Sequence, residues 1–121
     1  MLTVPSSIIY SAAISDNANY CLGQLELVGE DPMNAEDWVK HDGCVFYQNK
    51  LTSAVGVGHA SFTKSPDGTQ DWIVYHGMVD PTTGWAARTI RTQEFTWNAD
   101  GTPKFPRPGY GPYAVPSGQV G

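Results

Sequence analysis

The sequence has few charged residues and few basic ones in particular. Only 16% of its 121 residues are charged, and seven Lys and Arg against twelve Asp and Glu give a formal net charge of −5. An acidic chain without a Lys or Arg cluster does not suit a phosphate backbone, so nucleic acid is not expected as a partner. No apolar run reaches the roughly 20 residues of a membrane helix, so a membrane partner is not expected either.

Cysteine is scarce, and neither the first residues nor a glycosylation sequon gives a hint of export. Cys21 and Cys44 are its two cysteines. They allow either one disulfide or two buried thiols, and the spacing does not decide between these. The first residues lack the basic and apolar regions of a signal peptide. No Asn-x-Ser/Thr sequon occurs.

Glycine, proline and aromatic residues are abundant. The chain has thirteen Gly, nine Pro, four Trp, six Tyr and four Phe, and a hydrophobic share of 40%. Gly and Pro favour turns, and aromatic residues favour half-buried pleated surfaces. The length fits one domain. We therefore expect an all-β chain, with a composition that is common among sugar-binding proteins.

The first half of the chain predicts a hairpin and a short helical turn. Residues 8–12 and 20–27 are β-prone, and the second run alternates apolar and polar positions. Turn residues at 16–19 join them. A short helical turn should follow, with Asp31 as its N-cap and Pro32 in the first helical position.

The second half predicts an antiparallel meander. Strands are expected at 60–64, 71–76 and 88–97, joined by turn sequences, after a further short strand at 44–47. The Pro-rich tail, 103–121, should be extended and outside the sheet. At about 45 residues per blade, 121 residues supply fewer than three blades of a β-propeller, which needs at least four.

Two blocks, 58–68 and 95–103, resemble the last blade of glycoside hydrolase family 43. Residues 71–76 and Arg88 extend the resemblance, which is strongest to the arabinofuranosidase-type members. It implies a partial five-bladed β-propeller of about two blades with an irregular tail. Residues 1–50 would belong to the penultimate blade, 51–102 to the last blade and 103–121 to the tail.

The resemblance also implies a reaction. Family members hydrolyse arabinose- or xylose-containing plant polysaccharides such as arabinan and arabinoxylan, with inversion, using an Asp base, a Glu acid and a further Asp. In the family, the Glu comes just before the strand matched by 8–12, yet residues 1–7 contain no Asp or Glu. The chain would then be a fragment of an exported, extracellular α-L-arabinofuranosidase. We therefore expect it to contain no catalytic residue and to be inactive alone.

His59 matches a family histidine near the propeller axis. The resemblance implies a metal contact there, with one calcium ion approached through water, and a place beside the substrate. Calcium prefers oxygen ligands, so water mediation fits better than direct ligation. The alternative is a buried, hydrogen-bonded histidine.

Arg88 matches a family arginine in the substrate pocket. A guanidinium can donate to sugar hydroxyls and lower the pKa of a nearby carboxylate. The alternative is a surface arginine. Arg91 should lie on the opposite face of the strand, because side chains alternate.

Among the four tryptophans, Trp85 is the best candidate for an exposed ring that stacks on substrate. Glu94 shares the strand parity of Arg88 but is expected to face solvent. Asp67 and Asp100 are explained by turns, and His76 by a structural role.

Other classes of protein remain open. The chain could be a non-catalytic carbohydrate-binding or interaction module that self-associates through open blade edges. It could also be a truncated, inactive product.

Overall fold

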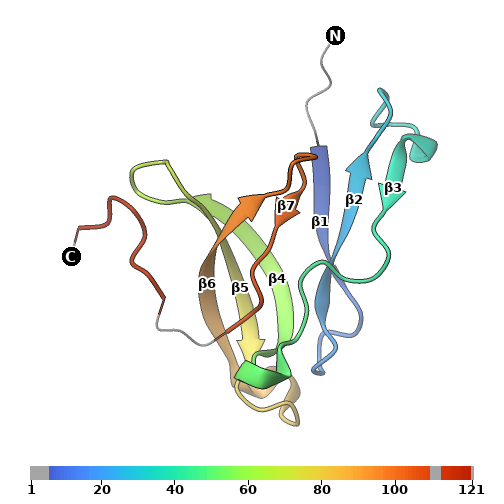
Figure 1. Cartoon of the computed structure of the whole chain (residues 1–121). Helices are drawn as coiled ribbons and strands as arrows, with labels where there is room; N and C mark the ends of the chain where they lie inside the picture. The colour runs from blue at the N-terminus through green and yellow to red at the C-terminus, as the bar shows by residue number, and fades with distance from the viewer. Residues whose placement is uncertain (1–5, 110–112, 121) are drawn as a thin grey trace.

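The structure, a computed structural model, describes residues 6–109 and 113–120. Its regular elements there are strands and short 3-10 helices, without an α-helix. Two antiparallel sheets lie side by side (Figure 1), so the all-β prediction is confirmed. Within the described part of the chain, no helix has the length and apolar character to cross a membrane.

The first sheet has three strands in the order β1-β2-β3. They are β1 (Ser6–Ala12), β2 (Cys21–Leu27) and β3 (Trp38–Lys40). β1 and β2 form the hairpin that the alternation of apolar and polar residues predicts. β3 was not predicted, because its three residues show no alternation of their own and pair only through the chain folding back on β2.

The helical turn after β2 begins later than predicted. The 3-10 helix η1 (Ala35–Asp37) has Asn34 as its N-cap, whose side chain accepts a hydrogen bond from the amide of Glu36. Asp31 caps the preceding turn, where it accepts from the amide of Met33 at 2.9 Å. Both short polar side chains can replace a backbone acceptor, so the sequence marks the turns but leaves the start of the helix open.

The second sheet is the predicted meander with one additional strand. Its order is β4-β5-β6-β7. The strands are β4 (Val55–Lys64), β5 (Asp71–Met78), β6 (Arg88–Trp97) and β7 (Pro103–Lys104). β7 corrects the prediction for the tail, since its two residues pair with the end of β6. A proline is tolerated there because β7 is the edge strand and its outer side needs no donor.

The segment predicted as a strand at 44–47 forms only one isolated bridge, between Leu22 and Phe46. β3 already pairs with residues 25–27 of β2, so this segment can pair only with the first residues of β2, near Leu22. Cys44 forms a disulfide with Cys21, with their Cα atoms 6.1 Å apart, which resolves the alternative that the sequence left open.

The hydrophobic core lies between the two sheets. Its buried side chains come from both: Leu22, Phe46, Val57, Ile73, Tyr75 and Phe95. The ring of Phe46 meets that of Tyr75 edge to face, with centroids 4.7 Å apart. Each sheet therefore presents one face to the other, as neighbouring blades do, and keeps its opposite face outside this core.

Candidate functional site

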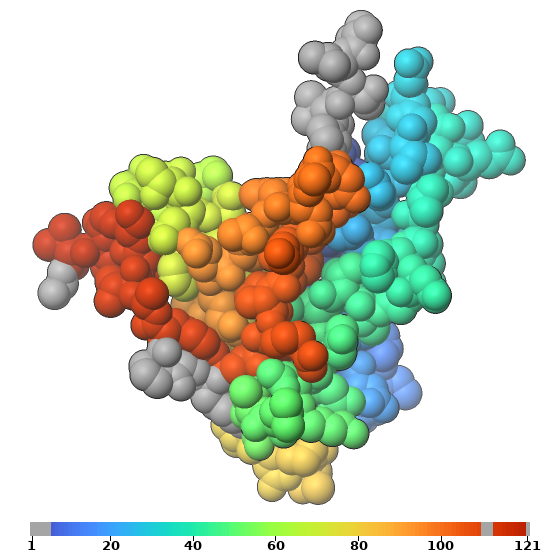
Figure 2. Space-filling view, in the orientation of Figure 1, coloured from blue at the N-terminus to red at the C-terminus, as the bar shows by residue number. Residues whose placement is uncertain are grey.

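Three connecting segments meet at one end of the strands. They are the β1–β2 connection (13–20), the 3-10 helix η2 (Lys50–Thr52) and the β5–β6 loop with the 3-10 helix η3 (Gly84–Ala87). Figure 2 shows the η2 segment in green and the β5–β6 loop in gold together at the lower end. The amide of Gly56 donates to the carbonyl of Ala18 at 3.1 Å, which joins β4 to the β1–β2 connection. We call this end of the molecule the connection end.

His59 lies at an irregularity of β4 near the connection end. The pairing of β4 with β5 shifts register between Gly58 and Ser61, and His59 has a φ of 50°. This left-handed conformation is uncommon for a residue other than glycine and costs on the order of 1 kcal/mol. The His59 amide donates to Oγ of Ser11 at 3.2 Å, and the residue is exposed. The predicted alternative of a buried histidine is therefore wrong.

His76 and Tyr20 lie beside His59. The imidazole rings of His59 and His76 have centroids 6.2 Å apart, and the ring of Tyr20 stacks on His76 at 5.4 Å. Nε2 of His76 is buried and has no hydrogen-bond partner among the described residues. Burial, and then the positive charges of Arg88, His59 and Arg91, lower the pKa of His76.

Arg88 opens strand β6 at the connection end. Its backbone pairs with Met78, and its side chain is exposed. Arg91 is only 7% exposed and donates from Nη2 to the carbonyl of Met78 at 3.0 Å. The two arginines thus lie on opposite faces of the strand, as predicted. Both arginines act on the pKa of His76 and lower it.

Trp85 lies in η3, three residues before Arg88. It is 60% exposed, in agreement with the prediction of an exposed ring. Its Nε1 donates to Oγ of Ser15 in the β1–β2 connection at 3.1 Å. The ring is thereby held in place while most of its surface stays open to solvent. Trp85 thus contacts the β1–β2 connection, His59 contacts the end of β1 through Ser11, and Arg88 and His59 both act on His76.

The weaker candidates have the roles that turns and exposure predict. Glu94 is exposed on β6. Asp67 accepts from the amide of Thr69 at 3.1 Å, and Asp100 accepts from the amide of Thr102 at 2.9 Å. These are capped turns.

The described residues near His59 do not make a calcium site by themselves. No group of three or more His, Cys, Asp or Glu suited to a metal ion occurs in residues 6–109 and 113–120. The neighbours of His59 are His76 and Ser11, and Arg88 adds positive charge. Calcium needs six to eight oxygen ligands. A calcium ion here stays a prediction, and its ligands would have to come from outside these residues.

The sequence did not indicate Tyr20 or the contact that His76 makes with it. Tyr20 directly precedes β2, and 56 positions separate it from His76. A signal could have come from Gly58, because a Cβ there would lie 2.4 Å from the Tyr20 ring. A glycine within a strand often marks such a close approach.

Several known proteins are similar to this chain. The model of the glycosyl hydrolases family 43 matches residues 8–103. An "extracellular exo-alpha-(1->5)-L-arabinofuranosidase" of Streptomyces avermitilis is 44% identical over an alignment of 105 residues, and the match covers 81% of this chain and 21% of the relative. "Alpha-L-arabinofuranosidase B" of Pyricularia oryzae is 40% identical over the same shares. The chain thus spans about a fifth of the length of these relatives.

Solved structures agree with the sequence comparison. The alpha-L-arabinofuranosidase of Lactobacillus brevis superimposes with a TM-score of 0.83 at 32% identity, over 93% of this chain and 36% of that one. A thermostable family-43 glycoside hydrolase superimposes with a TM-score of 0.81 at 25% identity, over 98% of this chain and 37% of that one. These neighbours are propeller enzymes, and the two sheets correspond to part of the propeller. The chain belongs to glycoside hydrolase family 43.

Proposed function

We propose that this chain forms two blades of an inverting α-L-arabinofuranosidase and supplies one wall of its sugar-binding pocket. The observation that carries the proposal is that Arg88, Trp85 and His59 are all exposed at or near the connection end, with Arg88 and His59 both beside His76. The catalytic carboxylates would come from the rest of the enzyme, which makes up most of the length of the relatives. Arabinan or arabinoxylan outside the cell would be the substrate, since one relative is named as extracellular.

Arg88 is proposed to bind the sugar. Its side chain is exposed, and its backbone is fixed by pairing with β5. A guanidinium offers several donors in fixed directions, which suits the hydroxyl groups of a sugar ring. The same positive charge would favour the ionised form of a carboxylate that approaches from a neighbouring blade.

Trp85 and His59 are proposed to shape the pocket. The exposed Trp85 ring can stack on the apolar C–H face of a sugar, and its hydrogen bond to Ser15 limits its movement. His59 keeps a left-handed backbone that has an energetic cost, and such strain is often retained at functional sites. Its ring would lie near the propeller axis, where the family resemblance implies a cation.

The chemical step would take place on carboxylates outside the described residues. An Asp would remove a proton from the attacking water, and a Glu would protonate the departing oxygen. Inversion requires these two carboxyl groups to be about 6.5–9.5 Å apart, with the water between them and the sugar. The part of this chain would be to hold the sugar and to bias a carboxylate toward its charged form.

A segment exchange tests this function. The matching 105-residue segment of the Streptomyces avermitilis relative is replaced by that of this chain, and hydrolysis of an aryl α-L-arabinofuranoside is measured. We expect an active chimera that loses about 100-fold in kcat/KM on Arg88→Gln, the effect of losing roughly 3 kcal/mol of transition-state stabilisation. The isolated 121-residue chain should give no hydrolysis.

The matched control is Lys104→Gln, which removes an exposed positive charge on β7. It should leave kcat/KM of the chimera within about twofold. A chimera that folds with the thermal stability of the parent enzyme but has no activity would contradict the proposed function. So would hydrolysis by the isolated chain, because it would put the catalytic acids inside these residues.

A further inference from the structure

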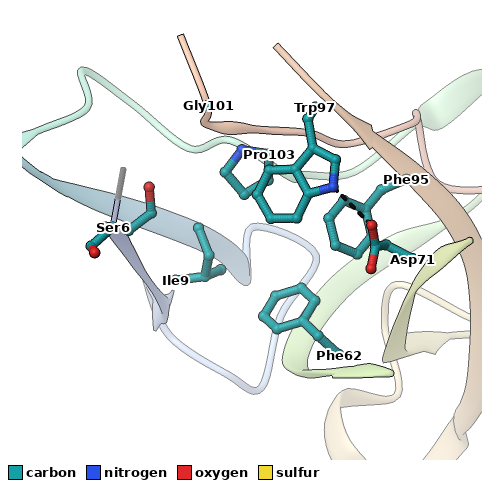
Figure 3. A pocket seen from close by; sticks show the side chains of 9 residues that line it. Ser6, Ile9, Phe62, Asp71, Phe95, Trp97, Gly101 and Pro103 are labelled. Carbon is teal, nitrogen blue, oxygen red and sulfur yellow. Dashed lines mark hydrogen bonds between the residues drawn. The ribbon is translucent and has the colours of Figure 1, made fainter. Parts of the chain in front are cut away.

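A hollow lies at the opposite end of the strands from Arg88. It has a volume of about 400 Å³ and lies between the start of β1 and the far ends of β5 and β6. Figure 3 shows the side chains around it, among them Ile9, Phe62, Asp71, Phe95, Trp97 and Pro103. None of Arg88, Trp85 and His59 lines this hollow.

One wall of the hollow is a fixed aromatic surface. Trp97 is 53% exposed, and its Nε1 donates to Oδ2 of Asp71 at 2.8 Å. Phe95 supports the ring from the same face of β6, with centroids 5.4 Å apart. Phe62 is 44% exposed and packs on Phe95 at 5.6 Å. Two half-exposed rings thus lie on a buried one, and the indole is held by a hydrogen bond.

Asp71 provides the polar side of the hollow. Its Oδ1 accepts from Nζ of Lys64 at 2.6 Å, while Oδ2 accepts from Trp97. These two hydrogen bonds lower the pKa of Asp71, so it is ionised at neutral pH. A carboxylate has about four acceptor positions, and two of them are used by these donors. Figure 3 shows the carboxylate beside the edge of the Trp97 ring.

The lining selects for the chemistry of the ligand. An anionic ligand is disfavoured by Asp71 and by the net charge of −5. A purely apolar ligand would cover a carboxylate without giving it hydrogen bonds, which is costly. A sugar ring has an apolar C–H face for the indole and hydroxyl groups for the carboxylate. It satisfies both requirements at once.

We propose that this hollow is a second sugar-binding site, in which one neutral sugar unit stacks on Trp97 and donates a hydroxyl to Asp71. That the sugar is arabinose rests on the proposed function, whereas the sugar chemistry rests on the lining of the hollow. A polymer held here and at the connection end would dissociate more slowly than from either site alone, because the second contact forms intramolecularly.

The test is an NMR titration of the 121-residue chain with an α-(1→5)-linked arabinotriose. Each of the four tryptophans has one indole N–H signal, so each site reports separately. We expect the Trp97 indole signal to shift saturably, with a Kd on the order of 1 mM. Asp71→Asn should weaken binding about tenfold, because a hydrogen bond to a charged acceptor is replaced by a neutral one.

Two variants serve as site controls. Trp97→Phe identifies the Trp97 signal and keeps an aromatic ring, and Trp97→Ala should abolish binding at this site. Trp85→Ala, at the connection end, should leave the titration of the Trp97 signal unchanged. The other indole signals, which keep their wild-type positions in a folded variant, show whether each variant is folded.

The possible outcomes separate this proposal from the proposed function. A saturable Trp97 shift with xylotriose, but not with arabinotriose, would support the second site and count against arabinose as its ligand. A Trp85 shift without a Trp97 shift would support the connection end and overturn the second site. No saturable Trp97 shift with either sugar up to roughly 20 mM, or binding unchanged in Trp97→Ala, also overturns it.

Discussion

Gly58 lies where β4 passes closest to Tyr20. A Cβ there would be 2.4 Å from Cε2 of the Tyr20 ring, which is 6% exposed and stacks on His76. The ring cannot move aside without disturbing that stack. We expect Gly58→Ala to lower the free energy of unfolding by about 1–3 kcal/mol, measured by urea unfolding with tryptophan fluorescence.

Ser61→Ala is the control for this substitution, because Ser61 is exposed on the same strand. It should change the free energy of unfolding by less than about 0.5 kcal/mol. If Gly58→Ala is as stable as the wild type, Tyr20 is not held against β4, and its stacking on His76 is then wrong as well.

The disulfide ties β2 to the segment that leads into η2. Cys21 and Cys44 are separated by 23 residues in sequence. A crosslink over a loop of this size stabilises by roughly 3 kcal/mol, largely by restricting the unfolded chain. Replacing both cysteines by Ser should lower the free energy of unfolding by this amount in urea unfolding. Reduced wild-type protein should show the same loss, and an unchanged midpoint after reduction would argue against the pairing.

At the scale of elements, the end of the tail is attached to the β4–β5 turn through Asp67. The Ser117 hydroxyl donates to Oδ2 of Asp67, and the Asp67 amide donates to the Ser117 carbonyl at 3.3 Å. Hydrogen bonds from Ser117, then Thr69 and Ser65, lower the pKa of Asp67 to well below its usual range. The hydrogen bond from the Ser117 hydroxyl therefore depends on the ionised carboxylate, while the Ser117 amide donates to Oε1 of Gln70 at 2.8 Å.

Because the pKa of Asp67 is lowered on folding, its contribution to stability falls at acidic pH. An unfolded aspartate titrates near pH 3.9, and the folded carboxyl of Asp67 titrates lower. The contribution of Asp67 is thus complete above about pH 5 and is lost as the pH falls through the folded pKa. The amide signal of Thr69, which donates to Asp67, should titrate in NMR with a midpoint below that of a free aspartate.

Asp67→Asn should remove this titration. Loss of the Ser117 hydroxyl contact should also loosen the tail and increase hydrogen exchange at the Ser117 amide, which donates to Gln70. Asp42→Asn, at an exposed position, is the matched control and should leave both signals as in the wild type. A Thr69 midpoint at or above the value of a free aspartate would show that the carboxylate does not accept these hydrogen bonds.

The long strands could be predicted because their signals are local. Leu25 and Leu27 alternate with Gln24 and Glu26, and turn residues flank β5 and β6. The short strands β3 and β7 could not, since each is defined by a partner strand and has no pattern of its own. The same holds for the segment around Phe46, whose pairing is limited by where β3 lies.

In the candidate site, too, the features with a local signal could be predicted from the sequence, and those that depend on contacts between distant segments could not. Strand parity placed Arg88 and Arg91 on opposite faces, and a turn-rich loop predicted the exposure of Trp85. The stack of Tyr20 on His76 depends on a contact between the two sheets. The sequence singled out Trp85 among the tryptophans and not Trp97, whose ring borders a hollow that exists only because β1 lies beside the end of β6. Contacts between distant segments leave no local pattern in sequence.

At the scale of the whole molecule, each sheet has a face that the other does not cover. On the outer face of the first sheet, Ile8, Leu25 and Trp38 line an apolar hollow of about 350 Å³. On the second sheet, Arg91 and Phe95 face the core, so Ile90 lies on the opposite face and is 85% exposed. In a complete propeller such faces are covered by neighbouring blades, which matches a chain that covers 36% of a solved relative.

An uncovered sheet face favours association of the isolated chain with itself. We expect its sedimentation coefficient to rise with protein concentration, and Ile90→Lys to weaken this association at least about tenfold. Burial of an isoleucine side chain contributes about 1.5–3 kcal/mol, and a tenfold change in affinity corresponds to about 1.4 kcal/mol. Leu51→Lys, at a 97% exposed position in η2, introduces the same charge away from this face and should leave the association unchanged.

Two results would mean that this face does not drive association. One is a wild-type chain that sediments as a monomer at every concentration, and the other is an Ile90→Lys variant that associates as strongly as the wild type. Ile90 would then tolerate solvent in the isolated chain.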